Sequence, residues 1–521
     1  MKSVMDHDFA VNPQVDLQRS SFDRSHGHKT TFDAGNLVPI YVDEALPGDT
    51  FSMNMAGFGR LATPIFPVMD NIFVDIHFFS VPMRQLWTNF RKFMGEQVDP
   101  GDSIDFTIPQ MDISAGVLPS TFEDHIGLPL GNPLTYNALF WRAYQHIYNE
   151  WYRDQNLIDS VDIELGDSTS TQAFGNQLLK RGKRHDYFTS CLPWPQKGDP
   201  VSVPLGDKAY ISGIGAISQA DYPSNPSVRE SGQTSNTTYD HAAVISTFSS
   251  GYFRGTEGTD GTLDIYADLT NATASTINQL REAFQIQRLL EKDARAGTRY
   301  AEIVKSHFGV DFIDLTYRPE FLGGGTSLIN INPVAQTSET DTTPKGDLSG
   351  FGTAGISNIG FTKSFNEHCI VIGIASVRAD LTYQRGINRM FSRETRYDFY
   401  WPTLAHIGEQ AVLNKELWYN NDSEDDDVFG YQERYAEYRY KPSTISGLFH
   451  SDITGSLDAW HLAQDFTSRP NLNQTFIEEN PPIDRVIATP SEPHLIFDFY
   501  FNLRCARPMP LFGIPGMIDH F

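Results

Sequence analysis

The stretch LIFDFYFNLR at residues 495–504 decides the fold class, because apolar and polar side chains alternate along it from Phe497 onward. One face of an extended chain would carry five apolar side chains, those of Leu495, Phe497, Phe499, Phe501 and Leu503. The other face would carry Asp498, Tyr500, Asn502 and Arg504. A period of two over this length predicts a β-strand with one face against a core.

Further strands are predicted far from this one along the chain. NIFVDIHFFSV at 71–81 alternates in the same way, and HCIVIGIASV at 368–377 has the pattern of a buried strand. Strands near both ends of a chain can pair only in a non-local, antiparallel, all-β topology. The sequence therefore predicts a mainly β protein, with an antiparallel jelly roll as the leading candidate and helices in its long connections.

Helical periodicity returns between the predicted strands. Pro133 reads as the first residue of a buried helix that runs to Tyr152. A second helical insertion is predicted at 276–309, where Gly297 breaks the first helix and Gly309 ends the next.

Polar segments of low periodicity separate these elements. Residues 212–275 and 335–360 are rich in Ser, Thr and Gly, and the longer of the two predicts a surface excursion or disorder. Residues 1–35 read as an extended N-terminal arm, and residues 506–521 as an extended, proline-punctuated C-terminal arm. Residues 36–505 are then expected to form a single domain with insertions.

Composition narrows the class of protein. The chain has 521 residues, of which 40% are hydrophobic, so a globular protein is expected. Its formal net charge of −25 is opposite in sign to that of a typical nucleic-acid-binding domain. Cys191, Cys369 and Cys505 are far apart and lack zinc or redox spacing, which indicates a reducing compartment. The sequence begins without the apolar core of a signal peptide and has no apolar run long enough to span a membrane, so cytosolic synthesis is expected.

Several segments resemble the major capsid protein of the Microviridae, and most of all its gokushovirus-type branch. They are TTFDAGNLVPIYVDEALPGDTF (30–51), LLKRGKRHDYFTSCLPWPQKG (178–198), LLEKDARAGTRYAEIVKSHFG (289–309), FGYQERYAEYRYKPS (429–443) and the closing strand with its tail. The resemblance covers nearly the whole chain and is weakest at 212–275 and 335–360.

The resemblance implies an eight-stranded jelly roll of the viral capsid type, which self-assembles into a small icosahedral bacteriophage shell around circular single-stranded DNA. It implies a virion protein that is assembled in the host cytoplasm and is not an enzyme, with a small basic DNA-binding or scaffolding companion. Surface protrusions of the family make residues 212–275 the candidate loop for contact with a host receptor.

Two basic clusters are candidates for nucleic-acid binding. The first consists of Lys180, Arg181, Lys183 and Arg184. The second consists of Arg385, Arg389, Arg393 and Arg396, which alternate with aromatic residues. Arginine beside stacking aromatic rings suits single-stranded DNA, because every nucleotide has a phosphate and every base a π-face. The same residues are also typical of subunit contacts, where arginines pair with carboxylates, and this alternative stays open.

The C-terminal arm carries candidate subunit-contact residues that are costly to expose as a group. They are Phe512, Ile514, Met517, Ile518 and Phe521. Burial under a neighbouring subunit would account for them, and docking on the parent chain is the alternative.

Short motifs that suggest other chemistry are weak. Gly350, Gly352 and Gly355 spell GxGxxG but lack a following helix, so a loop is expected. The acidic run 422–427 resembles a calcium loop without its central glycine, and His26 and His28 lack further metal ligands. No catalytic motif is present, so neither a catalytic site, a metal nor a cofactor is predicted. A β-sandwich carbohydrate-active hydrolase and a lectin-like binding protein remain the alternatives.

Overall fold

The computed structural model describes residues 18–168, 177–202, 276–311 and 316–513, together with the backbone of short strands at 170–171 and between 210 and 268. The chain divides into two compact units, residues 196–295 and the remainder. Both main sheets belong to the larger unit, which is mainly β and antiparallel, as expected.

The first main sheet brings both ends of the described chain together. Strand β23 pairs with β4 on one side and with β1 and β2 on the other, and β4 pairs in turn with β17 and β17 with β16. The bounds are β1 Ser20–Asp23, β2 His26–Phe32, β4 Thr50–Leu61, β16 Asn330–Ala335, β17 Leu348–Ser364 and β23 Leu495–Arg507. The predicted alternation of β23 is confirmed, because every second residue from Leu495 to Cys505 is buried and the residues between them are exposed.

The second main sheet has the strand order β15-β5-β18-β3. Its bounds are β3 Val38–Ala45, β5 Ile72–Pro82, β15 Glu320–Leu328 and β18 Cys369–Ala379. Alternate side chains of β5 and β18 pack against the first sheet, and those between them pack against a helical layer. Burial on both faces explains why β18 has a nearly continuous apolar sequence.

Close packing at the first sheet depends on glycine. Gly59 on β4 lies opposite Phe497 on β23, and a Cβ atom at Gly59 would come within 2.2 Å of the Phe497 ring. Gly350, Gly352 and Gly355 also lie in a strand, β17, so the prediction of a loop for GxGxxG is wrong. A Cβ atom at Gly352 would lie 2.8 Å from Cβ of Leu61, which indicates that this glycine serves strand packing.

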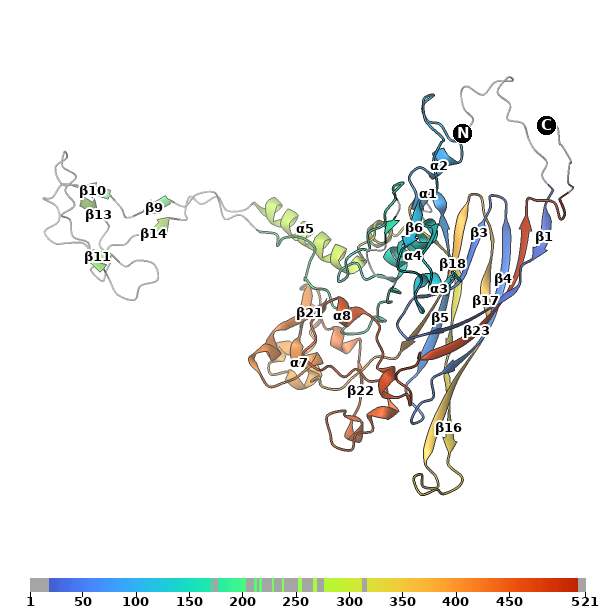
Figure 1. The fold of residues 1–521 in the computed structure, drawn as a ribbon. Coiled ribbons are helices and arrows are strands. Elements are labelled where there is room, and N and C mark those ends of the chain that lie inside the picture. Colours follow the sequence, from blue (N-terminus) through green and yellow to red (C-terminus); the bar gives the residue numbers. More distant parts are fainter. Residues whose placement is uncertain are drawn as a thin grey trace. The chain divides into compact units, whose positions relative to one another are not determined.

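A layer of helices and a small sheet covers the outer face of β5 and β18 (Figure 1). It contains α1 Met83–Leu86, α2 Phe90–Phe93, α3 Phe122–His125, α4 Leu139–Ile147, the π-helix Tyr148–Tyr152 and strands β6 Gln110–Ile113, β7 Leu134–Asn137 and β8 Ser170–Thr171. The helix predicted from Pro133 begins at Leu139 instead, because residues 134–137 pair with β6. Its end near Tyr152 is confirmed.

A largely irregular insertion follows β18 and ends before β23. It contains short strands β19 Thr382–Tyr383, β20 Glu409–Leu413, β21 Val428–Glu433 and β22 Ser443–Thr444, with helices α7 Asn414–Leu417 and α8 Gln474–Ile477. Several 3₁₀ turns lie between them, including Arg389–Ser392, Arg396–Asp398 and Ala436–Tyr438. An apolar cluster packs the insertion, including its residue Phe476, against the earlier segment that carries Tyr187 and Phe188.

The smaller unit contains most of helix α5, Ile277–Ala296, and three strand pairs. The pairs are nested, with β9 Tyr210–Ser212 on β14 Tyr266–Asp268, β10 Gly215–Ile217 on β13 Tyr252–Arg254, and β11 Ser227–Val228 on β12 Thr237–Thr238. Most of the predicted protrusion 212–275 lies outside the described residues. The predicted breaks at Gly297 and Gly309 are confirmed, since α6 spans Tyr300–Phe308 and both glycines have positive φ.

Both predicted arms are shorter than the sequence suggested. Residues 20–32 of the N-terminal arm form β1 and β2, and β23 extends through Arg507 into the predicted C-terminal arm. Strands β1 and β2 are short and polar, so they lack the alternating pattern that predicts a strand. They form because they pair with β23, and sequence periodicity does not reveal such pairing.

Candidate assembly and nucleic-acid surfaces

Two residues of the first basic cluster, Arg181 and Lys183, bind partners within the same chain. Nη1 of Arg181 lies 2.6 Å from Oδ2 of Asp75, and Nε of Arg378 reaches the same oxygen at 2.8 Å. Burial alone would raise the pKa of Asp75, but a hydrogen bond from Thr326 and the two guanidinium groups lower it to about 2. Arg181 also donates to Oγ of Ser376 at 2.8 Å. Its guanidinium is therefore paired within the chain.

Lys183 is buried as well. Its Nζ donates to the carbonyl of Phe476 at 2.7 Å and lies 4.8 Å from the centre of that ring. Burial lowers the pKa of Lys183, and the neighbouring Glu479 and Asp186 oppose that shift. These positions argue against nucleic-acid contact by Arg181 and Lys183.

The remaining two residues of this cluster reach the surface. Lys180 is half-buried and donates to Oδ1 of Asn480 at 3.2 Å, whereas the Arg184 side chain is exposed. Nucleic-acid contact stays a prediction for these two positions.

Three arginines of the second cluster pair with carboxylates of the same chain. Arg389 lies 2.9 Å from Oε1 of Glu416 and Arg393 lies 3.4 Å from Oε1 of Glu437. Arg385 pairs with Asp452 and stacks on the ring of Trp418 at 4.3 Å. Pairing with carboxylates was expected at subunit contacts, but these pairs form within one chain. Arg396 is exposed and its guanidinium lies over the Tyr397 ring at 4.7 Å.

Around these arginines lies a surface that we call the aromatic patch. Its members are Phe391, Tyr397, Phe399, Tyr400, Trp401, Tyr438 and Tyr440, whose exposed fractions lie between 47% and 75%. Arg393 joins the two segments of the patch, because its guanidinium lies 5.3 Å from the Phe399 ring and 4.4 Å from the Tyr438 ring. Tyr438 and Tyr440 were not among the predicted site residues, although the aromatic run FGYQERYAEYRY could have indicated them.

A hollow of about 370 Å³ adjoins the aromatic patch. Phe391 and Tyr440 line its rim, and the buried residues Tyr187, Tyr383 and Glu416 contribute to its lining. Tyr187 donates a hydrogen bond to Oε2 of Glu416 at 2.8 Å. The Tyr383 hydroxyl donates to Asp186 at 2.6 Å, so both buried tyrosine hydroxyls are satisfied within the chain, and the free surface of the hollow is mainly apolar.

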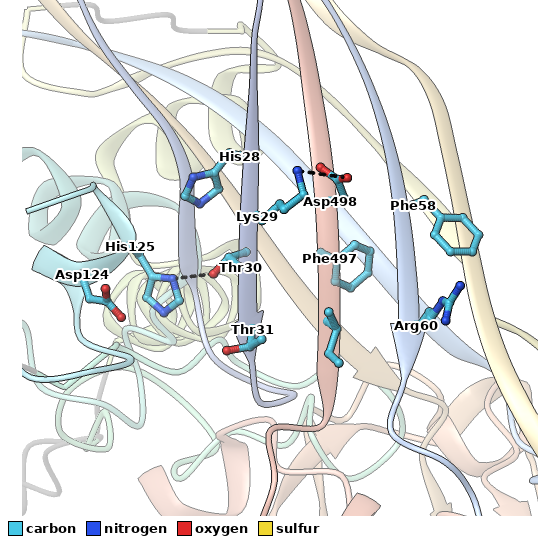
Figure 2. Close-up of a pocket in the computed structure, with 11 residues that line it drawn as sticks. His28, Lys29, Thr30, Thr31, Phe58, Arg60, Asp124, His125, Phe497 and Asp498 are labelled. Carbon is cyan, nitrogen blue, oxygen red and sulfur yellow. Dashed lines mark hydrogen bonds and ion pairs between the residues drawn. The ribbon is translucent and has the colours of Figure 1, made fainter.

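A second hollow, of about 550 Å³, opens on the first main sheet. Figure 2 shows its side chains on neighbouring strands: Lys29 and Thr31 from β2, Asp498 from β23, and Phe58 and Arg60 from β4.

The charged side chains of this second hollow balance one another. His125 Nδ1 lies 2.9 Å from the Thr30 hydroxyl, and Lys29 lies 3.5 Å from Asp498 (Figure 2). Asp124 and Asp498 balance Lys29 and Arg60, so the hollow lacks the excess positive charge of a phosphate site.

The acidic run is a structural ion-pair cluster. Arg469 lies 2.7 Å from a carboxylate oxygen of each of Asp422, Glu424 and Asp425. Within the described parts of the chain, no group of three or more His, Cys, Asp or Glu side chains is arranged to hold a metal ion. No described helix is both long and apolar enough to cross a membrane.

The C-terminal arm leaves apolar side chains in solvent. Leu511 and Phe512 are exposed, Phe512 by 80%. The other four candidate contact residues lie outside the described residues. The visible part of the arm therefore supplies unburied apolar surface at the end of β23.

An antiparallel sandwich that exposes an aromatic patch and the apolar side chains of its C-terminal arm is typical of a protein that associates through its surface. Comparison with known proteins identifies the kind. A family model described as "Capsid protein (F protein)" matches residues 11–517. The chain is 47% identical to Capsid protein VP1 of Bdellovibrio phage phiMH2K, with 99% of this chain and 98% of that protein covered.

Two further relatives carry the same description. Capsid protein VP1 of Chlamydia phage 1 is 41% identical over 99% of this chain and 98% of its own, and that of Spiroplasma virus 4 is 35% identical over 98% and 97%. The chain belongs to the capsid protein (F protein) family. The resemblance to Microviridae capsid proteins is thereby confirmed, and the protein is a component of the virion.

Proposed function

We propose that copies of this chain assemble into a small icosahedral shell that encloses a circular single-stranded DNA genome. The observation that carries the proposal is the match to capsid proteins along nearly the whole chain. A shell protein must expose surface that only its neighbours cover, and the aromatic patch and the C-terminal arm supply such surface.

The eight main strands form a jelly roll in this proposal. Strand order supports it, since β2-β23-β4-β17 and β15-β5-β18-β3 are two antiparallel four-stranded sets. Successive strands along the chain alternate between the two sets, except for β5 and β15, which are neighbours in one sheet. This wrapping is typical of a double Greek key.

The partners follow from charge and exposure. Lys180 and Arg184 remain the basic residues of the first cluster that could face the genome. A net charge of −25 opposes DNA enclosure, which supports a small basic companion inside the particle. Residues 212–275 are the proposed contact with a host receptor, and the C-terminal arm the proposed contact with a neighbouring subunit.

Electron microscopy of the purified protein tests the proposal. We expect closed particles of uniform size, and in particles from infected cells a nuclease-protected single-stranded circle. A protein that remains a lone protomer at high concentration, alone and with its basic companion, would contradict it.

A further inference from the structure

We propose that the aromatic patch and its adjoining hollow form a docking surface for a second copy of this chain, and not for DNA. The inference rests on the proposed function, which requires that copies contact one another. It names which surface of the insertion between β18 and β23 makes such a contact.

The size of the exposed aromatic surface fits a protein partner. Seven rings are each about half exposed or more. At about 200 Å² per aromatic side chain they offer on the order of 700 Å² of surface. A standard protein–protein interface buries about 800 Å² on each partner, so the patch alone approaches one side of such an interface.

Charge decides between the two classes of partner. Single-stranded DNA requires guanidinium or ammonium groups that are free to pair with phosphates. Arg389 and Arg393 already pair with Glu416 and Glu437, whose side chains are only 3% and 6% exposed. Arg396 is the exception in this cluster, because it is exposed and donates to the Tyr397 hydroxyl at 2.6 Å. A phosphate would have to displace the two buried carboxylates, whereas an apolar protein surface would leave both ion pairs in place.

The adjoining hollow gives the docking surface an anchor point. Energetically dominant interface residues are large side chains that fill pockets near the centre of an interface. The hollow is large enough for one such side chain, and Phe391 and Tyr440 frame its entrance. An apolar or aromatic side chain of the second copy would displace water there without breaking the Tyr187–Glu416 hydrogen bond.

The double substitution Phe391→Asp with Tyr440→Asp tests the inference. Both side chains are more than half exposed, so the thermal unfolding midpoint of the protomer should change little. Sedimentation velocity on a dilution series should show association weakened at least tenfold relative to the wild type. The control pair Phe391→Leu with Tyr440→Phe keeps the surface apolar and should associate as the wild type does.

The other results overturn the inference. Unchanged assembly of the Asp double variant would show that this surface is not a contact between copies, and the shell function would stand. Loss of fluorescent oligo(dT) binding with unchanged assembly would assign the patch to DNA. A wild type that never associates would refute both proposals. If the double variant unfolds, Phe391→Ser alone replaces it, since Phe391 is 75% exposed.

Discussion

Asp75 on β5 and Arg181, which lies 106 residues later in the chain, form a partly buried, hydrogen-bonded ion pair of 2.6 Å. Arg378 on the neighbouring strand β18 completes the group and is only 1% exposed. One carboxylate thus holds two arginines from distant segments. The segment that carries Arg181 resembled a DNA-binding cluster in the sequence, but this pairing fixes it to the second main sheet.

Asp75→Asn should therefore destabilise the protein by about 3 to 5 kcal/mol, because it leaves the buried Arg378 and the partly buried Arg181 guanidinium groups without this counter-ion. The midpoint of urea unfolding, followed by near-ultraviolet circular dichroism, measures the effect. Asp498→Asn is the matched control. It removes an exposed pair with Lys29 and should cost less than about 1 kcal/mol. An equal loss of unfolding free energy in the two variants would show that the ion pairs of Asp75 do not stabilise the fold more than an exposed pair does.

Acid should destabilise the fold below pH 6.5. Burial lowers the pKa of His146 to about 4, although its hydrogen bond to the Tyr317 carbonyl opposes the shift. Burial likewise lowers the pKa of His125 to about 4. The unfolded chain binds these protons near pH 6.5 and the folded chain only near pH 4, so stability is lost as the pH falls between those values. Below that range Asp75, with a pKa of about 2, adds a further loss.

Unfolding midpoints at a series of pH values between 7.5 and 4.5 test this dependence. His146→Gln should reduce the slope of unfolding free energy by up to about 1.4 kcal/mol per pH unit. His185→Gln, which replaces an exposed histidine, is the matched control variant. A slope that His146→Gln does not change would exclude this residue as the source.

Charge reversal separates the two arginines of the first basic cluster. Arg184→Glu should leave shell yield unchanged, because the Arg184 side chain is exposed and forms no ion pair with the described part of the protomer. It should lower the DNA content per particle, because it replaces a positive charge with a negative one. Arg181→Glu should instead prevent folding, because it would place a second carboxylate beside Asp75. The absorbance ratio at 260 and 280 nm of purified particles measures DNA content, with Arg184→Lys as the control. Full DNA content in Arg184→Glu particles would remove this residue from the DNA contacts.

The elements that the sequence predicted correctly are those whose pattern arises within one segment. Strand β23 alternates over its own length, and Gly309 ends α6 through its own left-handed backbone conformation. Strands β1 and β2 were assigned to an arm, because the partner that makes them strands lies more than 460 residues away. Sequence periodicity also does not predict which distant carboxylate a guanidinium pairs with. The ion pairs of Arg181, Arg389 and Arg393 could therefore not be predicted from the sequence.

The C-terminal arm offers the last test, and β23 sets where a truncation can begin. Nε of Arg507 lies 3.3 Å from the fully buried carboxylate of Asp49, so a deletion that includes Arg507 would damage the protomer itself. Deletion of 511–521 removes only residues beyond that anchor, including the exposed Leu511 and Phe512. We expect the truncated chain to keep its thermal unfolding midpoint and to give soluble protomers or pentamers in place of shells.

A full-length variant with Leu511→Ser and Phe512→Ser separates the loss of apolar contacts from the loss of chain length. If the arm completes a neighbouring subunit through these side chains, this variant should also weaken assembly, although by less than the deletion. Electron microscopy and sedimentation velocity distinguish shells from pentamers in both cases. Shells of normal size and yield from the truncated chain would mean that the arm serves its own subunit, and burial under a neighbour would then have to be abandoned.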